Sequence, residues 1–239
     1  MQIQHADVTR TCPEFDIINE KLALDGKSII ELGCGTAEIT RVIAEGGPDR
    51  SVLALEVDEI QHAKNLEITD LPNVSFQLAG AQAIPAADAC ADVVFMFKSL
   101  HHVPGELLAQ SFQEIARVLK PGGYAYISEP VFAGEFNEIL RLFHDEQAVR
   151  MAAFAATCAT VESGLLELVE QVFFNTPARF ADFADFESKV IGVTHTRHQL
   201  SDDVYEQVQT RFAQNMGANG ADFVAPIRVD LLRKPQRAA

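Results

Sequence analysis

The chain alternates between short apolar runs and longer segments in which apolar residues recur at the three- and four-residue spacing of a helix. A short apolar run between turn residues predicts a buried strand, and the longer spacing predicts an amphipathic helix. Alternation of the two is typical of an α/β fold with a parallel sheet. The expected strands are residues 28–32, 51–56, 74–78, 92–97 and 124–128, followed by 165–174 and 223–232.

Helical spacing covers most of the segments between these runs. Helix formers also fill residues 135–161, and a short helix is expected around the aromatic residues between 180 and 191. Ser201 or Asp202 is suited to cap a further helix that reaches Gln214. The earlier expected helices are residues 14–24, 36–45, 59–67 and 106–120.

A glycine turn joins the first strand to the helix that follows it. Gly33 and Gly35 allow the backbone to turn sharply and to approach a ligand, and the first amides of the helix would point at that ligand. A dinucleotide-binding loop would have a third glycine at position 38, where Glu38 stands. The second strand ends at Glu56, whose two carboxylate oxygens suit both hydroxyls of a ribose; Asp58 is the alternative, although it also suits the N-cap of the next helix.

Three segments carry a resemblance to a known family. The loop with Glu31, Gly33 and Gly35 resembles motif I of the class I S-adenosylmethionine-dependent methyltransferases, with Ala37 in place of the third glycine. The Leu-His-His of residues 100–102 and the Arg-Val-Leu-Lys-Pro-Gly-Gly of residues 117–123 are similar to two further motifs of that family. The resemblance covers residues 27–129 and is closest to the small-molecule, type 11-like group.

The resemblance implies a fold, a cofactor and a set of contacts. The fold is a Rossmann-like α/β sheet of seven mostly parallel strands, with helices on both faces and a helical lid. The cofactor is S-adenosyl-L-methionine: Glu31 would contact its amino group directly or through water, Glu56 its ribose and Val57 its adenine. Gly80 replaces the family's adenine-binding aspartate, which leaves Ala81 and Gln82 to meet the base edge. The expected cofactor-binding residues are Glu31, Gly33, Cys34, Gly35, Glu56, Val57, Ala81, Gln82 and Lys98.

Two adjacent histidines follow the fourth strand at the sheet edge where ligands bind in such folds. His101 or His102 is suited to remove a proton from the methyl acceptor near neutral pH, and the alternative is that both only line the wall of the pocket. Glu129 ends the fifth strand, where it would face substrate or cap a helix. His144, His195 and His198 are candidates for the acceptor pocket, but their spacing predicts no metal site.

Charge and cysteine content narrow the classes of partner. The formal net charge of -15, without a compensating basic run, disfavours nucleic acid as a substrate. We expect a cytoplasmic protein, because no apolar stretch is long enough for a membrane span and the first residues lack the pattern of a signal peptide. The four widely spaced cysteines predict reduced thiols.

We therefore predict a single-domain enzyme that transfers a methyl group from S-adenosylmethionine to a small molecule. Its expected parts are an N-terminal helix or cap (1–26), a cofactor-binding core (27–129), a helical lid with substrate-side insertions and strand six (130–222), and a last strand with a tail (223–239). The alternatives are a non-catalytic cofactor-binding or partner protein and a nucleotide-dependent oxidoreductase. Oligomeric state stays open, with a homodimer as one option.

Overall fold

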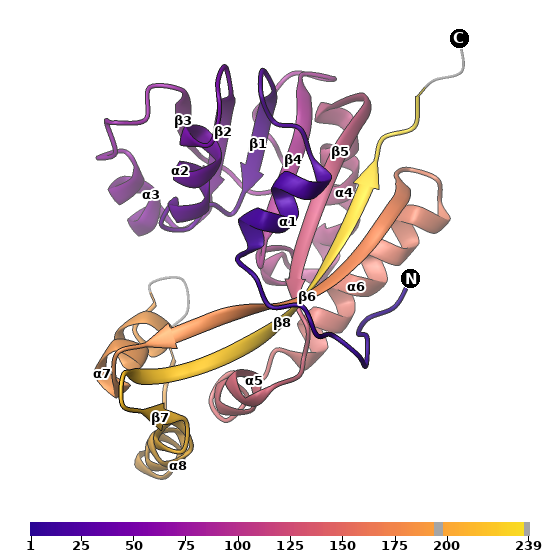
Figure 1. Ribbon diagram of the computed structural model, residues 1–239. Helices are drawn as coiled ribbons and strands as arrows, with labels where there is room; N and C mark the ends of the chain where they lie inside the picture. Colours follow the sequence, from indigo (N-terminus) through magenta and orange to yellow (C-terminus); the bar gives the residue numbers. More distant parts are fainter. Residues whose placement is uncertain (194–197, 237–239) are drawn as a thin grey trace.

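The computed structural model describes residues 1–193 and 198–236. Its strands form one sheet in the order β3-β2-β1-β4-β5-β8-β6, and the two-residue β7 pairs with β8 (Figure 1). The five parallel strands are β1 (Ser28–Leu32), β2 (Ser51–Glu56), β3 (Val74–Leu78), β4 (Ala91–Phe97) and β5 (Leu119–Pro130). The antiparallel part comprises β6 (Glu167–Phe180), β7 (Met216–Gly217) and β8 (Gly220–Arg233). The predicted α/β fold is confirmed, and β7 is an addition to the seven strands expected.

The described helices lie on both faces of the sheet and at the far end of its long strands. They are α1 (Glu14–Lys21), α2 (Glu38–Glu45), α3 (Glu59–Asn65), α4 (Leu108–Val118), α5 (Glu135–Leu140), α6 (Gln147–Glu162), α7 (Phe183–Phe186) and α8 (Asp202–Ala213). Short helical turns at Leu100–His102, Gly105–Leu107 and Glu187–Ile191 complete the list. Ser201 caps α8, because its hydroxyl accepts a hydrogen bond from the amide of Val204.

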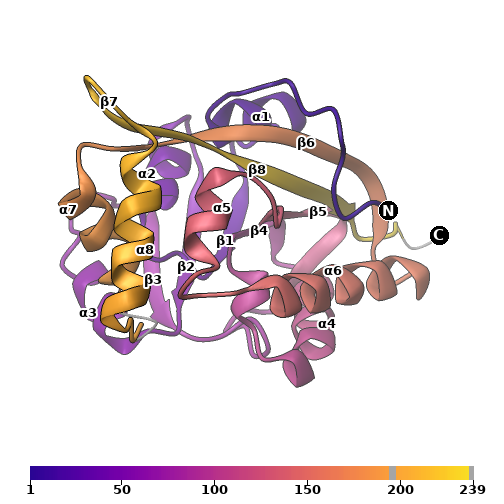
Figure 2. The same ribbon diagram turned by 90° about the horizontal axis from the view of Figure 1, so that it is seen from below.

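The central parallel strands β1, β2 and β4 are mostly apolar because both of their faces are buried. Along β4, Val93 and Phe95 pack in one core with α1 and α2, whereas Val94 and Met96 pack in a second core with α4 and α6. Figure 2 shows α1 on one side of the strands and α4 and α6 on the other. The alternation of side chains along a strand therefore divides the core into two layers.

Several predicted boundaries were wrong by a few residues. Helix α1 ends at Lys21, since Leu22 is extended with φ -134° and ψ 133°. Helix α4 is shorter than the predicted 106–120, and a 3-10 turn precedes it. Strand β5 begins at Leu119, which pairs with Ala91 before the register shifts, so the Pro-Gly-Gly turn lies within the strand range. The region 135–161, predicted to be rich in helix formers, contains two helices, α5 and α6.

A long hairpin extends the sheet into a separate helical layer. Strands β6 and β8 pair along their whole length, from Glu167 opposite Arg233 to Phe180 opposite Ala221. They run beyond the parallel strands to α7 and α8, with α5 nearby (Figure 1). Phe180, placed in a helix by the sequence pattern, ends β6 and packs with Phe186, Phe212 and Phe223 in a third apolar core. This layer is the part of the fold expected as a lid.

Two expectations fall partly outside the described residues. His195 lies in the undescribed segment 194–197, and the last three residues of the predicted tail are also outside the description. Within residues 1–193 and 198–236, the helices lack the combination of length and apolar character that crossing a membrane demands.

Candidate cofactor and acceptor site

The glycine loop after β1 has the backbone that its sequence predicts. Gly33 and Gly35 have φ of 73° and 51°, values that favour glycine. A side chain at Gly33 would also collide with Ser99, since a Cβ there would lie 2.7 Å from the Ser99 Cβ. The Ser99 hydroxyl donates a hydrogen bond to the carbonyl of Leu32 at 2.8 Å. The segment after β4 therefore packs directly on the loop after β1.

The third position of the loop differs from expectation. Ala37 is the residue before α2 and has φ 62° and ψ 22°, a left-handed conformation that a residue with a Cβ rarely adopts. Because of this, α2 begins at Glu38 and not at Thr36 as predicted. Ala37 is buried, so the small side chain fits the space while the backbone remains in the glycine-like region.

Glu56 joins the end of β2 to the glycine loop. Its Oε2 accepts a hydrogen bond from the amide of Gly35 at 2.8 Å. Its Oε1 accepts from the amides of Val57 and Asp58 at 2.7 and 2.9 Å. A carboxylate has about four lone-pair positions, so one position on Oε2 remains for a ligand. The structure thus holds Glu56 ready to accept one hydroxyl, where the sequence suggested two.

Asp58 is occupied as a helix cap. Its Oδ1 accepts hydrogen bonds from the amides of Ile60 and Gln61, which are in the first turn of α3. This arrangement satisfies two amides that have no partner within the helix. The geometry therefore favours Glu56 over Asp58 as the acid for a ribose.

Glu31 is buried beneath the loop. Its Oε2 accepts a hydrogen bond from the hydroxyl of Thr40 at 2.7 Å, which connects β1 to the first turn of α2. Burial raises the pKa of Glu31 to about 7, although the bond from Thr40 opposes this shift. The sequence analysis did not identify Thr40 as a partner of Glu31. Its position on the inner face of α2 could have indicated this contact.

The Cys34 thiol faces the interior of the loop. Asn65 at the end of α3 donates one hydrogen bond to the carbonyl of Gly35 at 2.8 Å and another to the Cys34 sulfur at 3.5 Å. Burial raises the pKa of the Cys34 thiol well above its usual value, so the residue is not a reactive thiolate. Asn65 was not identified from sequence, and its role is to hold the loop in place.

The predicted adenine contacts lie next to Glu56. Val57 has 65% of its side chain exposed, an unusual setting for an apolar residue beside a buried acid. The turn after β3 is tied to the same strand end, because the amide of Ala79 donates to the carbonyl of Glu56 at 3.0 Å. Ala81 is buried in this turn, and the Gln82 side chain lies over Gly80.

Lys98 directly follows β4 and has a left-handed conformation with φ 54°, and its amide donates to the carbonyl of Ser128 at 2.7 Å. Its ammonium lies close enough to the buried Glu14 to affect that carboxylate: burial raises the pKa of Glu14 and the charge of Lys98 opposes the rise. Strained backbone of this kind is often found at functional sites. Glu14 was not identified from sequence, although it shares a helical face with the buried Ile17 and Ile18.

His101 is held between two carboxylates. Its Nδ1 lies 2.5 Å from Glu129 Oε2, and its Nε2 lies 3.4 Å from Glu146 Oε1. The other oxygen of Glu129, Oε1, accepts a hydrogen bond from the amide of Leu100, the first residue of the short helical turn after β4, at 3.0 Å. Both oxygens of this buried acid are therefore engaged within the protein. Burial lowers the pKa of His101, but the charge and hydrogen bond of Glu129, with Glu146, outweigh burial and raise it to about 9.

Among the described residues, three further histidines lie near His101 and Glu146. The exposed ring of His102 lies 4.1 Å from that of His101, centroid to centroid. His144, between α5 and α6, has its Nε2 3.0 Å from Glu146 Oε1, and the His198 ring is 4.7 Å from that of His144. Three segments distant in sequence thus meet beside the end of β4. The sequence placed Glu146 only beside His144 and Asp145, where the spacing predicted no metal site, and nothing linked it to His101.

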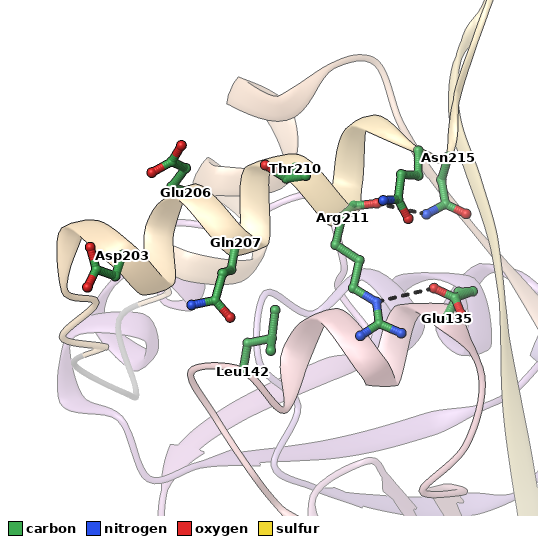
Figure 3. A pocket seen from close by; sticks show the side chains of 9 residues that line it. Glu135, Leu142, Asp203, Glu206, Gln207, Thr210, Arg211 and Asn215 are labelled. Atoms are coloured by element: carbon green, nitrogen blue, oxygen red, sulfur yellow. Dashed lines mark hydrogen bonds and ion pairs between the residues drawn. The ribbon is translucent and has the colours of Figure 1, made fainter.

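A separate groove of about 880 Å³ lies between α5 and α8 (Figure 3). Its lining is mostly polar, and the ion pair between Arg211 and Glu135 crosses it. No predicted cofactor or catalytic residue lines this groove. We therefore place the candidate site at the glycine loop and the histidines, on the basis of their geometry.

Comparison with known proteins finds similarity over the part of the chain that contains the glycine loop and the two adjacent histidines. Residues 29–123 match the family model described as a methyltransferase domain. Demethylmenaquinone methyltransferase of Lactococcus lactis is 36% identical over 104 residues, 42% of this chain and 40% of the relative. The 27-O-demethylrifamycin SV methyltransferase of Amycolatopsis mediterranei is 33% identical over 104 residues, 41% of this chain and 36% of the relative. The chain thus spans less than half the length of these curated relatives.

The fold extends further than the sequence similarity. A Bacillus halodurans protein described as a candidate methyltransferase superposes with a TM-score of 0.64 at 16% identity, covering 93% of this chain and 99% of its own. At that identity the match concerns the fold alone. The sequence similarity is confined to residues 29–123, which contain the glycine loop, Glu56 and the two histidines and match a methyltransferase domain; it supports S-adenosyl-L-methionine as the cofactor.

Proposed function

We propose that the protein transfers a methyl group from S-adenosylmethionine to a small-molecule acceptor. The observation that carries this proposal is the hydrogen bond from the Gly35 amide to Glu56, which brings a glycine turn and a ribose-type acid to one edge of the sheet. Ligands bind at this edge in open α/β sheets. The small-molecule names of two relatives favour an acceptor of the same size class, and the net charge of -15 disfavours nucleic acid.

The cofactor would lie along the loop. The carboxypropyl part would pass over Gly33, Cys34 and Gly35, and Glu56 would accept one ribose hydroxyl at its remaining lone pair. The exposed side chain of Val57 would cover one face of the adenine, with Ala81 and Gln82 at the base edge. Glu31 accepts a hydrogen bond from Thr40. It would therefore contact the amino group of the cofactor through water, and it would also hold α2 in place through Thr40.

Methyl transfer from a sulfonium is an in-line displacement, so the alignment of acceptor, methyl and sulfur supplies most of the acceleration. A base is needed only where the acceptor must lose a proton. Both ring nitrogens of His101 face carboxylates, and its raised pKa keeps it protonated at neutral pH. We therefore assign proton removal to His102 and a positioning role to His101, with Lys98 as a cofactor or substrate contact.

Each part of the fold has a proposed role. Residues 27–129 would bind the cofactor, residues 1–26 would cover that site, and α5, α7 and α8 would close over the acceptor. His144, which contacts Glu146, and His198, whose ring packs on that of His144, would line the acceptor pocket. Four free cysteines are compatible with the cytoplasm, our proposed location. Assembly as a homodimer is a separate proposal to be tested by light scattering.

The test is methyl transfer from cofactor labelled in its methyl group to a panel of hydroxylated aromatic compounds, amines and carbon acids. We expect label in at least one product class, with His102→Gln slowing turnover on hydroxyl acceptors but leaving cofactor affinity unchanged. Turnover that is unchanged in His102→Gln would remove the base assignment. Transfer to none of these acceptors, despite tight cofactor binding, would favour the non-catalytic alternative, and NADH consumption would favour an oxidoreductase.

A further inference from the structure

We propose that His101, His102, His144 and Glu146 form a binding site for one divalent transition-metal ion of the zinc class. His101, His102 and Glu146 each offer a ligand atom, and these three atoms lie within 4.8 Å of one another. His144, two residues before Glu146, contacts the same carboxylate oxygen. Sequence spacing gave no indication of this group, because its members come from two segments that meet only in the folded chain.

The spacing of the ligand atoms is close to that of a metal site. Glu146 Oε1 lies 3.4 Å from His101 Nε2 and 3.0 Å from His144 Nε2. With metal–ligand distances of about 2.0–2.1 Å, ligand atoms at tetrahedral positions are about 3.4 Å apart. His144 contacts Glu146 but lies outside the group of three whose ligand atoms are within 4.8 Å of one another, so its side chain would have to rotate to join an ion held by His101, His102 and Glu146.

The ligand side chains are held by hydrogen bonds of the kind that are common around metal sites. The second nitrogen of His101, Nδ1, faces Glu129, which is itself fixed by the Leu100 amide. Ligating histidines commonly donate their other ring N–H to a carboxylate, which fixes the ring and strengthens the ligand. The second oxygen of Glu146, Oε2, is held by Arg150 at 2.5 Å, so only Oε1 points at the histidines. Both ligands are therefore oriented before an ion arrives.

The donor set and the charge select the kind of ion. Three imidazoles and one carboxylate suit zinc, cobalt or iron(II), whereas magnesium and calcium prefer oxygen ligands. Glu129, Glu146 and Arg150 together carry a net charge of about -1, and a bound ion would take the place of the proton that His101 carries without it. His102 is exposed and His144 is partly exposed, so the site opens to solvent.

The site lies beside the cofactor loop, since Ser99, two residues before His101, packs on Gly33. An acceptor oxygen bound to the ion would lose its proton more readily, because a bound divalent ion lowers the pKa of its oxygen ligands. With the ion bound, His102 is a ligand, and this effect of the ion takes the place of proton removal by a free His102. This catalytic consequence rests on the proposed function. Binding of the ion does not, since it can be measured on the protein alone.

The test uses untagged protein that has been treated with a chelator and titrated with zinc chloride by calorimetry, without cofactor. We expect one equivalent of zinc to bind, with magnesium chloride giving no saturable heat. His102→Gln and His144→Asn, both at solvent-accessible positions, should each weaken zinc binding at least tenfold, and Glu146→Gln at least a hundredfold. The surface substitution His5→Gln is the matched control and should bind as the wild type does.

A spectroscopic readout checks the ligands directly. Cobalt(II) should give the visible absorption of a four- or five-coordinate ion in the wild type and in His5→Gln, and this absorption should be lost in His144→Asn. Thermal unfolding of each variant shows that it is folded. Absence of stoichiometric zinc binding in the wild type, or binding that His102→Gln and His144→Asn both leave unchanged, would overturn the proposal.

The same protein batches separate this proposal from the proposed function. If S-adenosylhomocysteine gives saturable heat and zinc does not, the metal site alone is overturned. Zinc binding without S-adenosylhomocysteine binding overturns the proposed cofactor role and leaves the metal site standing.

Discussion

The carboxylate of Glu56 accepts the backbone amide of Gly35 at 2.8 Å, so the end of β2 fixes the loop that follows β1. Two further amides, of Val57 and Asp58, bind the other oxygen. One side chain therefore shapes the loop and presents an acceptor to the ligand. Both functions can be tested by replacing that residue.

Glu56→Ala should abolish measurable binding of S-adenosylhomocysteine and lower the free energy of unfolding by about 3 kcal/mol, since three hydrogen bonds of about 1 kcal/mol each are lost. Calorimetry and denaturant unfolding measure the two effects. Asp58→Ala is the control: it removes a helix cap worth about 1 kcal/mol and should leave cofactor binding unchanged. Loss of binding in Asp58→Ala with binding retained in Glu56→Ala would reverse our assignment of the ribose acid.

Ala37→Gly should stabilise the protein by about 1 kcal/mol, because alanine at φ 62° is strained and glycine is not. Denaturant unfolding measures the change. Ala109→Gly, at an exposed position in α4, is the control and should cost about 1 kcal/mol, since glycine weakens an ordinary helix. Destabilisation of both variants to the same extent would show that Ala37 is not strained.

Glu31→Gln should change how stability depends on pH. The folded pKa of Glu31 is about 7, above the ordinary value of 4.5, so the folded wild type holds this proton more tightly than the unfolded chain. Its stability therefore falls as pH rises from about 4.5 to 7, by up to about 3 kcal/mol from this group. Glutamine cannot ionise, so the variant should lack that decline. If the free energy of unfolding changes with pH in the same way in both proteins, the folded pKa of Glu31 is not raised.

Val57→Asn should lower affinity for S-adenosylhomocysteine about fivefold, as expected for losing some 40 Å² of apolar contact with the adenine. Because the side chain is 65% exposed, the free energy of unfolding should change by less than about 0.5 kcal/mol. Val42→Asn, an exposed position on α2, is the matched control for affinity. Equal affinities for both variants would contradict an adenine site at Val57.

The parallel half of the fold could be predicted because its signals are local. Each strand is a short apolar run, and Gly33 and Gly35 mark the turn at φ values that favour glycine. The left-handed Ala37 could not be predicted, since alanine favours a helix. The length of the β6–β8 hairpin was also hidden, because Pro177 and Pro226 interrupt the strand pattern yet both pair within it.

The acceptor side was the least predictable part of the site. The Leu-His-His motif located His101 and His102, but their neighbours Glu129, His144 and Glu146 follow different elements and carry no spacing that links them to the histidines. Their meeting depends on how α6 packs against the turn after β4. Tertiary packing, and not local sequence, decides the charge and contacts of His101.

The most direct test of the account is calorimetric titration of the purified protein with S-adenosylhomocysteine, with NAD in a parallel cell. We predict saturable binding of one equivalent of S-adenosylhomocysteine and no binding of NAD, because Glu38 stands where a dinucleotide loop has its third glycine. Binding of NAD alone, or of neither compound by protein shown to be free of copurified nucleotide, would contradict the assignment of the glycine loop and Glu56 as a S-adenosylmethionine site.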